Sequence, residues 1–116
     1  MGDSPPRDTF SALADPTRRA ILDLLREQPE LTAGALAAAF PHISRPAVSK
    51  HLGVLREAGL VHVREAGREW HYALDPAPLA AAHREWWERF VPLWDERLAH
   101  LKRNAERVST RRGSGA

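Results

Sequence analysis

The sequence predicts a mainly α-helical chain with one small β-hairpin, in the element order α-α-α-α-β-β-α. Three observations predict it: two short helical segments joined by a tight turn, two alternating strands around a glycine, and a long helical run after them. The 116 residues are enough for one compact domain and too few for two. A hydrophobic share of 43% is ordinary for a folded globular protein.

The composition excludes several classes of protein. Without any cysteine, the chain has no disulfide, thiolate nucleophile, iron–sulfur cluster or Cys-bound zinc. It shows no Gly-rich phosphate loop, serine elbow or paired-carboxylate segment, so we expect neither an enzyme nor a cofactor. No apolar run approaches the ~18 residues of a membrane span and no charged-then-apolar leader opens the chain. We therefore expect a cytoplasmic protein with no membrane partner.

Aspartate and proline set the limits of the first helices. Residues 1–8 are polar and expected to be flexible, and one helical turn can follow over Thr9–Leu13. Asp15-Pro16 then starts a helix, because Asp suits the N-cap and Pro the first helical position, and Gln28-Pro29 stops it. A second helix is predicted from Thr32 to Pro41-His42. Its apolar positions are Ala33, Leu36, Ala37 and Phe40.

The third helix carries the clearest local signals. Ser44 is its N-cap, and Ile43 before the cap pairs with Val48 as a hydrophobic staple. Gly59 ends the helix, because only glycine takes the left-handed conformation without strain. Two helices joined by about four residues, the second one capped at both ends, are typical of a helix-turn-helix.

Two alternating segments, Val61–Glu65 and Trp70–Leu74, follow this helix and predict a β-hairpin. Gly67-Arg68 between them fits a two-residue type II′ turn, which needs glycine first. Because a lone two-stranded ribbon is only marginally stable, we expect it to pack on the helices. Pairing across the turn sets Val61, Val63 and Glu65 opposite Leu74, Tyr72 and Trp70, and puts Arg64 and His71 on the other face.

A long helix is expected from Asp75-Pro76 to about Val108, with a kink or a split at Pro92. It carries two apolar stripes, more than a single small domain can cover, so we expect a partner subunit. Residues 109–116 are expected to be a disordered Gly/Ser tail. One stripe is His83, Trp86, Phe90 and Leu93, and the other, the predicted dimer interface, is Trp87, Val91, Trp94, Leu98 and Leu101, continued by Ala105 and Val108.

The outer face of the third helix predicts DNA binding. On a helical wheel, Val48, Leu52 and Leu55 define the core side. A helix lying in a major groove must approach closely, so short side chains on its outer face help, and its N-terminal side chains reach bases and phosphates. The outer face consists of Pro46, Ser49, Lys50 and Gly53, flanked by Arg45 and Arg56.

The segments Ser44–Val61 and Ala14–Leu25 resemble the winged helix-turn-helix repressors of the ArsR/SmtB type. The resemblance covers most of Phe10 to Leu74 in motif order and spacing. It implies a homodimer, a recognition helix in the major groove, a hairpin wing at the DNA backbone, and repression of a nearby operon. The base-contacting positions that it implies are Arg45, Pro46, Ser49 and Lys50, which are also outward on the wheel.

Phosphate contacts are less sharply defined. The wing places Arg64 and Arg68 near phosphates, although each can equally be a solvated surface charge. The amide end of the helix that begins at Thr32 is a further candidate. Arg56 is either a phosphate clamp or a salt-bridge partner. His51 lies nearer the core side, so a packed or capping role is favoured over base reading.

The sequence departs from the metal-sensing pattern of the family it resembles. Thr32 and Gly34 fill the positions of its thiol ligands, and His83 and His100 stand 17 residues apart without the expected partners. We therefore expect the metal-independent branch and no metal site. The tryptophans of the last helix are interpreted as interface core, with a pocket for an unknown small-molecule effector as the alternative.

The resulting organisation has residues 9–75 as a DNA-binding domain and residues 76–108 as a dimerisation segment. The expected partners are double-stranded DNA and a second copy of the chain. An interaction module that contacts only proteins is the alternative function. Salt-dependent duplex binding separates the two possibilities.

Overall fold

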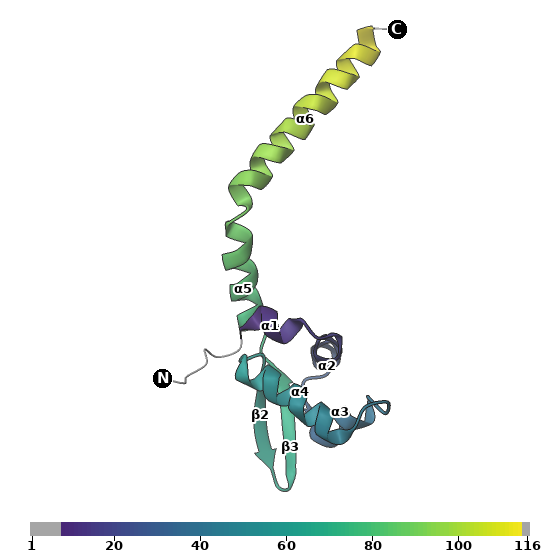
Figure 1. Ribbon diagram of the computed structural model, residues 1–116, viewed down its shortest axis with the longest axis vertical. Helices are drawn as coiled ribbons and strands as arrows, with labels where there is room; N and C mark the ends of the chain where they lie inside the picture. Colours follow the sequence, from purple (N-terminus) through teal and green to yellow (C-terminus); the bar gives the residue numbers. More distant parts are fainter. Residues whose placement is uncertain (1–7, 115–116) are drawn as a thin grey trace. The chain divides into compact units, whose positions relative to one another are not determined.

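A computed structural model describes the backbone of residues 8–114 and the side chains of residues 8–108 (Figure 1). The chain divides into two compact units at Ala82, and each is described by itself below. No helix in the described part of the chain has the length and apolar character needed to span a bilayer. The elements are α1 (Thr9–Leu13), α2 (Pro16–Glu27), β1 (Leu31–Thr32), α3 (Ala33–Ala38), α4 (Arg45–Glu57), β2 (Val61–Ala66), β3 (Glu69–Leu74), α5 (Ala77–Glu88) and α6 (Val91–Ser114).

Side-chain caps start the helices where the sequence predicted them. An Asp15 oxygen accepts hydrogen bonds from the N–H groups of Thr17 and Arg18 at 2.8 and 3.1 Å. The hydroxyls of Thr32 and Ser44 cap α3 and α4 in the same way, at 3.0 and 3.2 Å. These bonds satisfy N–H groups that have no partner inside the helix. Asp8, the last residue of the predicted arm, caps α1, and residues 1–7 of that arm lie outside the described residues.

The end of α4 confirms the role of Gly59, whose φ is +75°. Its N–H donates to the carbonyl of Arg56, and the next N–H, of Leu60, donates to the carbonyl of Leu55, both at 2.9 Å. This pair of bonds is the Schellman motif, which requires a left-handed residue after the helix. The chain therefore reverses sharply from α4 into β2.

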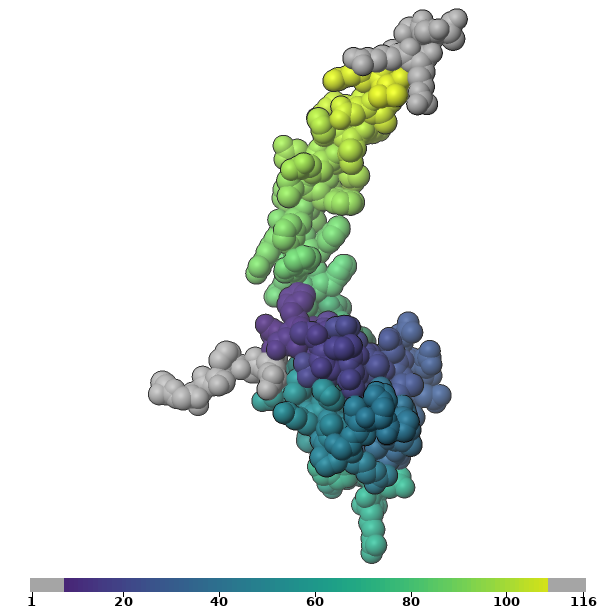
Figure 2. Space-filling model, turned by 45° about the vertical axis from the view of Figure 1, so that its right-hand side comes forward, coloured from purple at the N-terminus to yellow at the C-terminus, as the bar shows by residue number. Residues whose placement is uncertain are grey.

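The hairpin has the predicted register, with Val61, Val63 and Glu65 opposite Leu74, Tyr72 and Trp70. Gly67 has a φ of +63°, and no residue other than glycine within 8–114 has a positive φ. Positive φ at Gly67 followed by negative φ at Arg68 matches a type II′ turn and excludes type I′. Figure 2 shows the turn standing out from the surface of its unit.

A third strand was not predicted. β1 pairs with β3 in antiparallel register, Leu31 opposite Tyr72, and gives the sheet order β1-β3-β2. Two residues are too few to show the alternation that marks a strand in a sequence. The strand fixes the segment between α2 and α3 to the hairpin.

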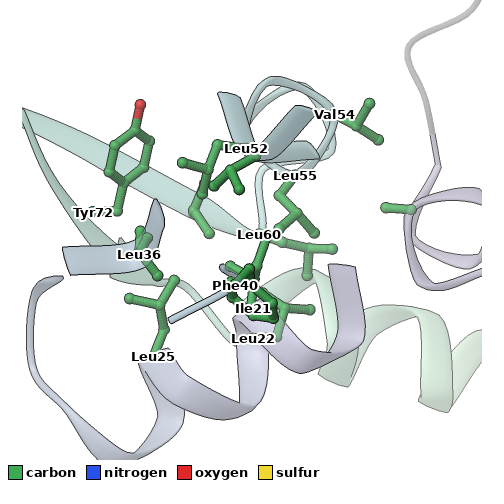
Figure 3. Packing of buried hydrophobic residues seen from close by; sticks show 13 residues of the cluster. Ile21, Leu22, Leu25, Leu36, Phe40, Leu52, Val54, Leu55, Leu60 and Tyr72 are labelled. Carbon is green, nitrogen blue, oxygen red and sulfur yellow. The ribbon is translucent and has the colours of Figure 1, made fainter. Parts of the chain in front are cut away.

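One core holds the first unit together (Figure 3). Ile21 from α2, Leu36 from α3 and Leu55 from α4 are fully buried, and Tyr72 brings the hairpin into the same cluster at 7% exposure. The prediction that the hairpin packs on the helices is thereby confirmed, since β2 contacts α4 and β3 contacts α2. Ala33, placed on the apolar side of its helix by spacing, is exposed instead because α3 begins with it.

The second unit runs from His83 through the end of α5 and all of α6. The predicted split near Pro92 is confirmed: the helix breaks at residues 89–90, and Pro92 lies in the first turn of α6. Proline is tolerated there because it lacks the N–H that a residue inside a helix must donate. α6 continues to Ser114, so the predicted tail is helical to that point, and residues 115–116 lie outside the described residues.

Candidate nucleic-acid interface

The two faces of α4 differ as the helical wheel predicted. Val48, Leu52 and Leu55 are at most 3% exposed and anchor the helix in the core. At Gly53, an added Cβ would meet no atom within 4 Å, so the glycine leaves the outer face open. The exposed residues of α4 are Arg45, Pro46, Ser49, Lys50, Gly53, Arg56 and Glu57. With three cations and one carboxylate, this is a narrow ridge of net positive charge on a helix anchored in the core.

Hydrogen bonds of Arg18, which the sequence did not reveal, connect α4 with α1 and α2. Arg18 of α2 donates through Nε to the carbonyl of Ala12 at 2.7 Å and through Nη1 to Nδ1 of His51 at 3.3 Å. The same nitrogen of His51 lies 3.8 Å from the carboxylate of Asp15. His51 is half-buried in this contact, which agrees with the packed role expected for it.

The surroundings of Asp15 favour the charged form of its carboxylate. Burial alone would raise its pKa, but the N–H bonds from Arg18 and Thr17 and the nearby His51 and Arg18 together leave the pKa below its ordinary value. One carboxylate therefore both caps α2 and lies near His51 of α4.

The two wing arginines occupy different environments. Arg68 sits in the exposed turn of the hairpin. Arg64, by contrast, donates from Nε and Nη2 to the two oxygens of Glu30, at 3.1 and 2.7 Å. This fork-shaped pair lowers the pKa of Glu30 and raises that of Arg64, in both cases chiefly through the hydrogen bonds between them. The positive charge of Arg64 is thus compensated within the protein.

His71 joins the cluster around Glu30. Its Nδ1 lies 3.5 Å from a Glu30 oxygen, and its Nε2 lies 3.4 Å from the carboxylate of Glu69. Arg64 and His71 face each other across the strands, as the predicted register required. Glu30 itself carried no signal in the sequence, since it lies 34 residues from Arg64.

Arg56, near the end of α4, lies over the ring of Trp70 on β3, with its guanidinium carbon 5.8 Å from the ring centroid. The sequence left Arg56 open between a phosphate clamp and a salt-bridge partner. The contact is a cation–π interaction, which orients the side chain without neutralising its charge. Trp70 remains 43% exposed and was not among the predicted site residues.

The base of the wing is closed by Asp75. Its side chain accepts the N–H of Ala77 at 2.9 Å, which starts α5, and contacts Nε2 of His62 at 2.6 Å. The hydrogen bond from the Ala77 N–H contributes most to a lowered pKa of Asp75, and the contact with His62 lowers this pKa further. The backbone N–H of Asp75 also donates to the carbonyl of Leu60 at 2.8 Å, which joins the two ends of the hairpin.

The two positions at α3 that correspond to the family's thiol ligands hold no metal-binding side chain. The Thr32 hydroxyl is engaged in capping the helix, and Gly34 has no side chain. Among the residues that the structure describes, no group of three or more His, Cys, Asp or Glu residues is placed to hold a metal ion. These residues therefore do not fit a metal.

The predicted dimer residues lie on the second unit. Trp87 and Trp94 pack ring to ring across the break between α5 and α6, with centroids 5.9 Å apart, and remain 42% and 50% exposed. Leu98 and Leu101 follow on α6 at 45% and 61% exposure. Val91 is half-buried at the start of α6. Four of these five apolar side chains are thus at least two-fifths exposed within the chain.

Residues 13–64 match a family model described as a helix-turn-helix domain. The chain is similar to the HTH-type transcriptional regulator Rv2034 of Mycobacterium tuberculosis, 53% identical over 76 residues that cover 66% of this chain and 69% of the relative. It is also 40% identical to the transcriptional repressor SdpR of Bacillus subtilis, over 62% of this chain and 78% of that protein.

Solved structures show the same likeness. A crystal structure described as an ArsR family transcriptional regulator aligns with a TM-score of 0.66 at 34% identity, covering 74% of this chain and 86% of that one. A second, described as a possible transcriptional regulator for arsenical resistance, aligns at 0.65 and 42% identity, covering 80% and 95%.

Proposed function

The chain belongs to the ArsR/SmtB family of winged helix-turn-helix transcriptional regulators, and from this premise we propose that its α4 reads the major groove of an operator whose genes it represses. Members of the family are DNA-binding regulators and not enzymes. Repression is proposed because relatives such as SdpR are named transcriptional repressors. Because the target is DNA, we place this activity in the cytoplasm.

The observation that carries the proposal is the narrow outer ridge of α4. The major groove, about 12 Å wide, admits an α-helix, and short side chains at the centre of the outer face let the helix approach the bases closely. Ser49 and Gly53 are such residues at the centre of the ridge. Arg45 and Lys50 then reach outward, the first from the N-terminal turn that enters such grooves in helix-turn-helix proteins. We assign base contact to Arg45, Pro46, Ser49 and Lys50.

The wing and the end of α4 supply phosphate contacts in this proposal. Arg68 in the turn is the wing cation that binds the backbone. Arg56, oriented by Trp70, is a phosphate clamp, since a cation–π contact leaves its charge available. Arg64 supports the wing through Glu30 instead of contacting a phosphate. A phosphate at Thr32 stays a prediction.

A homodimer presents two such ridges. We propose that the exposed apolar face formed by Trp87, Val91, Trp94, Leu98 and Leu101 joins two copies. Two copies related by a two-fold axis read an imperfect palindrome, with half-sites separated by one helical turn of DNA or a multiple of it.

The test is footprinting and titration on the DNA upstream of the chain's own gene. Arg45→Ala and Lys50→Ala should each weaken operator binding by ~1–3 kcal/mol, and Arg45→Ala should also relax sequence selectivity. Arg26→Ala is the matched control, because Arg26 is an exposed arginine on α2 next to Asp23. Unchanged binding in both ridge variants would remove α4 from the interface. A complete absence of duplex binding at low salt would favour the protein-interaction module. The footprint should not change with zinc, nickel or EDTA.

A further inference from the structure

A hollow of about 200 Å³ lies between α3 and α4, next to the ridge. Val48 and Leu52 of α4 are only 2% and 3% exposed and form its floor, whereas Arg45 and Ser49 are exposed residues of the ridge itself. We call this space the α3–α4 hollow. The residues that line it are Ala33, Gly34 and Ala37 of α3 and Arg45, Val48, Ser49 and Leu52 of α4.

The lining of the α3–α4 hollow suits an apolar group. The side chains of its alanines, valine and leucine can neither donate nor accept a hydrogen bond, but they give an incoming apolar group dispersion contacts and remove it from water. Of the residues that line the hollow, only Arg45 is charged and only Ser49 carries a hydroxyl. The hollow therefore favours an apolar group that has a hydrogen-bond acceptor beside it.

The α3–α4 hollow is bordered on two sides by residues proposed to bind DNA. On one side are Arg45 and Ser49, which are assigned to base contact. On the other side, Ala33 and Gly34 also line a second hollow, of about 260 Å³, together with Arg68 of the hairpin turn. Arg68 is the wing cation proposed to bind the DNA backbone. An operator that contacts both the ridge and the turn passes over the α3–α4 hollow.

The chemistry of the major groove narrows the choice of occupant to one group. Base edges there present nitrogen and oxygen acceptors, amino donors and one large apolar group, the C5-methyl of thymine. The O4 acceptor of thymine lies beside that methyl group on the same edge.

We infer that the α3–α4 hollow receives the C5-methyl group of one thymine in each operator half-site. The small residues of α3 thereby become determinants of sequence specificity, and the hydroxyl of Ser49 donates to O4 of the same base. This inference rests on the proposed function and names the base that the interface selects at one position.

The first test removes the methyl group from the DNA. Each thymine of the footprinted operator is replaced in turn, together with its symmetry mate, by deoxyuridine, which pairs in the same way and lacks only the C5-methyl. Burial of one methyl group contributes ~0.8 kcal/mol, so the sensitive position should lose about fourfold in affinity for each half-site, or about 15-fold for the pair, in fluorescence anisotropy. Operator binding that is indifferent to every thymine methyl would refute this inference alone. Wild-type protein that binds no duplex would refute the proposed function itself.

The second test fills the hollow from the protein side. Ala37→Leu should abolish the difference in affinity between the thymine and deoxyuridine operators. Ala38→Leu is the matched control, because Ala38 is the next residue of α3, is exposed and does not line the hollow, so this variant should keep the wild-type difference. Each comparison uses two duplexes on one protein, so a loss of stability that affects both cancels.

Gly34→Ala provides a milder variant that keeps the test decisive if Ala37→Leu fails to fold. A Cβ added at Gly34 would have Oγ1 of Thr32 as its nearest neighbour, at 3.9 Å, so the fold has room for it. This variant should reduce the difference between the two operators. An undiminished difference in Ala37→Leu and Gly34→Ala would place the methyl group elsewhere on the ridge, such as against Pro46, and would overturn the inference.

Discussion

The sharpest prediction compares the two arginines of the wing, which have the same chemistry on the same hairpin. Arg68→Ala removes a cation exposed in the turn. Arg64→Ala removes a cation already paired with both oxygens of Glu30, at 3.1 and 2.7 Å. A sequence gives no reason to treat them differently. Of these two arginines, only Arg68 is predicted to contribute to the salt dependence of DNA binding.

The magnitude follows from counting phosphates. Each neutralised phosphate contributes about 0.9 to the slope of log affinity against log salt. The proposed dimer carries two copies of Arg68, so Arg68→Ala should lower the slope by about 1.8. Extrapolated from a 1 M reference, this corresponds to an affinity loss of about 30-fold at ~0.15 M salt. Arg64→Ala should leave the slope unchanged, because the charge of Arg64 is compensated in the free protein.

The assay is fluorescence anisotropy of a labelled operator duplex, titrated at several salt concentrations with wild type and both variants. Thermal unfolding of each variant checks that the wing and its unit are folded. Equal reductions of slope by the two variants would show that Arg64 leaves Glu30 to bind a phosphate. No reduction with Arg68→Ala would show that the turn of the hairpin does not meet the backbone.

Three other perturbations have defined outcomes. Gly53→Ala should raise the free energy of unfolding by ~0.5–1 kcal/mol in chemical denaturation, because the glycine lies inside α4 with open space around it. The added methyl group should also weaken operator binding in fluorescence anisotropy, because it thickens the outer face of the helix. Stronger binding would contradict the proposal that α4 lies in the major groove. Asp15, Glu30 and Asp75 have lowered pKa values in the folded chain, so the stability that they contribute is complete above the pKa values of the unfolded chain and is lost as the pH falls below about 4. Melting temperatures measured from pH 6 to pH 3 should show this loss, and they should fall less steeply in Glu30→Gln. An equally steep fall in Glu30→Gln would show that the Glu30–Arg64 pair is not a cause of the loss. Leu98→Asp should give monomers in sedimentation and a matching loss of operator affinity, whereas His100→Asp, two residues away and outside the proposed dimer interface, should leave the dimer intact. A persistent Leu98→Asp dimer would place the interface elsewhere.

Local rules were sufficient for most of the fold. Asp15, Ser44 and Gly59 end or begin helices through bonds to residues two to five positions away, and such bonds are readable from neighbouring letters. The strand register followed from the turn at Gly67, because a two-residue loop leaves one pairing that puts the apolar side chains on one face. The outward ridge of α4 followed from helical periodicity alone.

Contacts between segments that are distant in the sequence could not be predicted from it. Arg64 resembled Arg68 in the sequence, but the strand β1 brings Glu30 beside the hairpin and pairs it with Arg64. Trp70 looked like one more apolar strand residue until the packing of β3 near the end of α4 set it against Arg56. Arg18 and His51 are 33 residues apart and meet because α2 and α4 cross.

The sequence by itself determined where α2 and α4 begin and end, which way the hairpin pairs and which face of α4 points outward, because each of these depends on interactions within a few residues. The tertiary structure alone decided which cations are paired with a carboxylate of the same chain. A charge is available or compensated according to what lies within about 4 Å of it. For Arg64 that neighbour comes from a segment 34 residues away, positioned by a core and a sheet that form only when the whole unit folds.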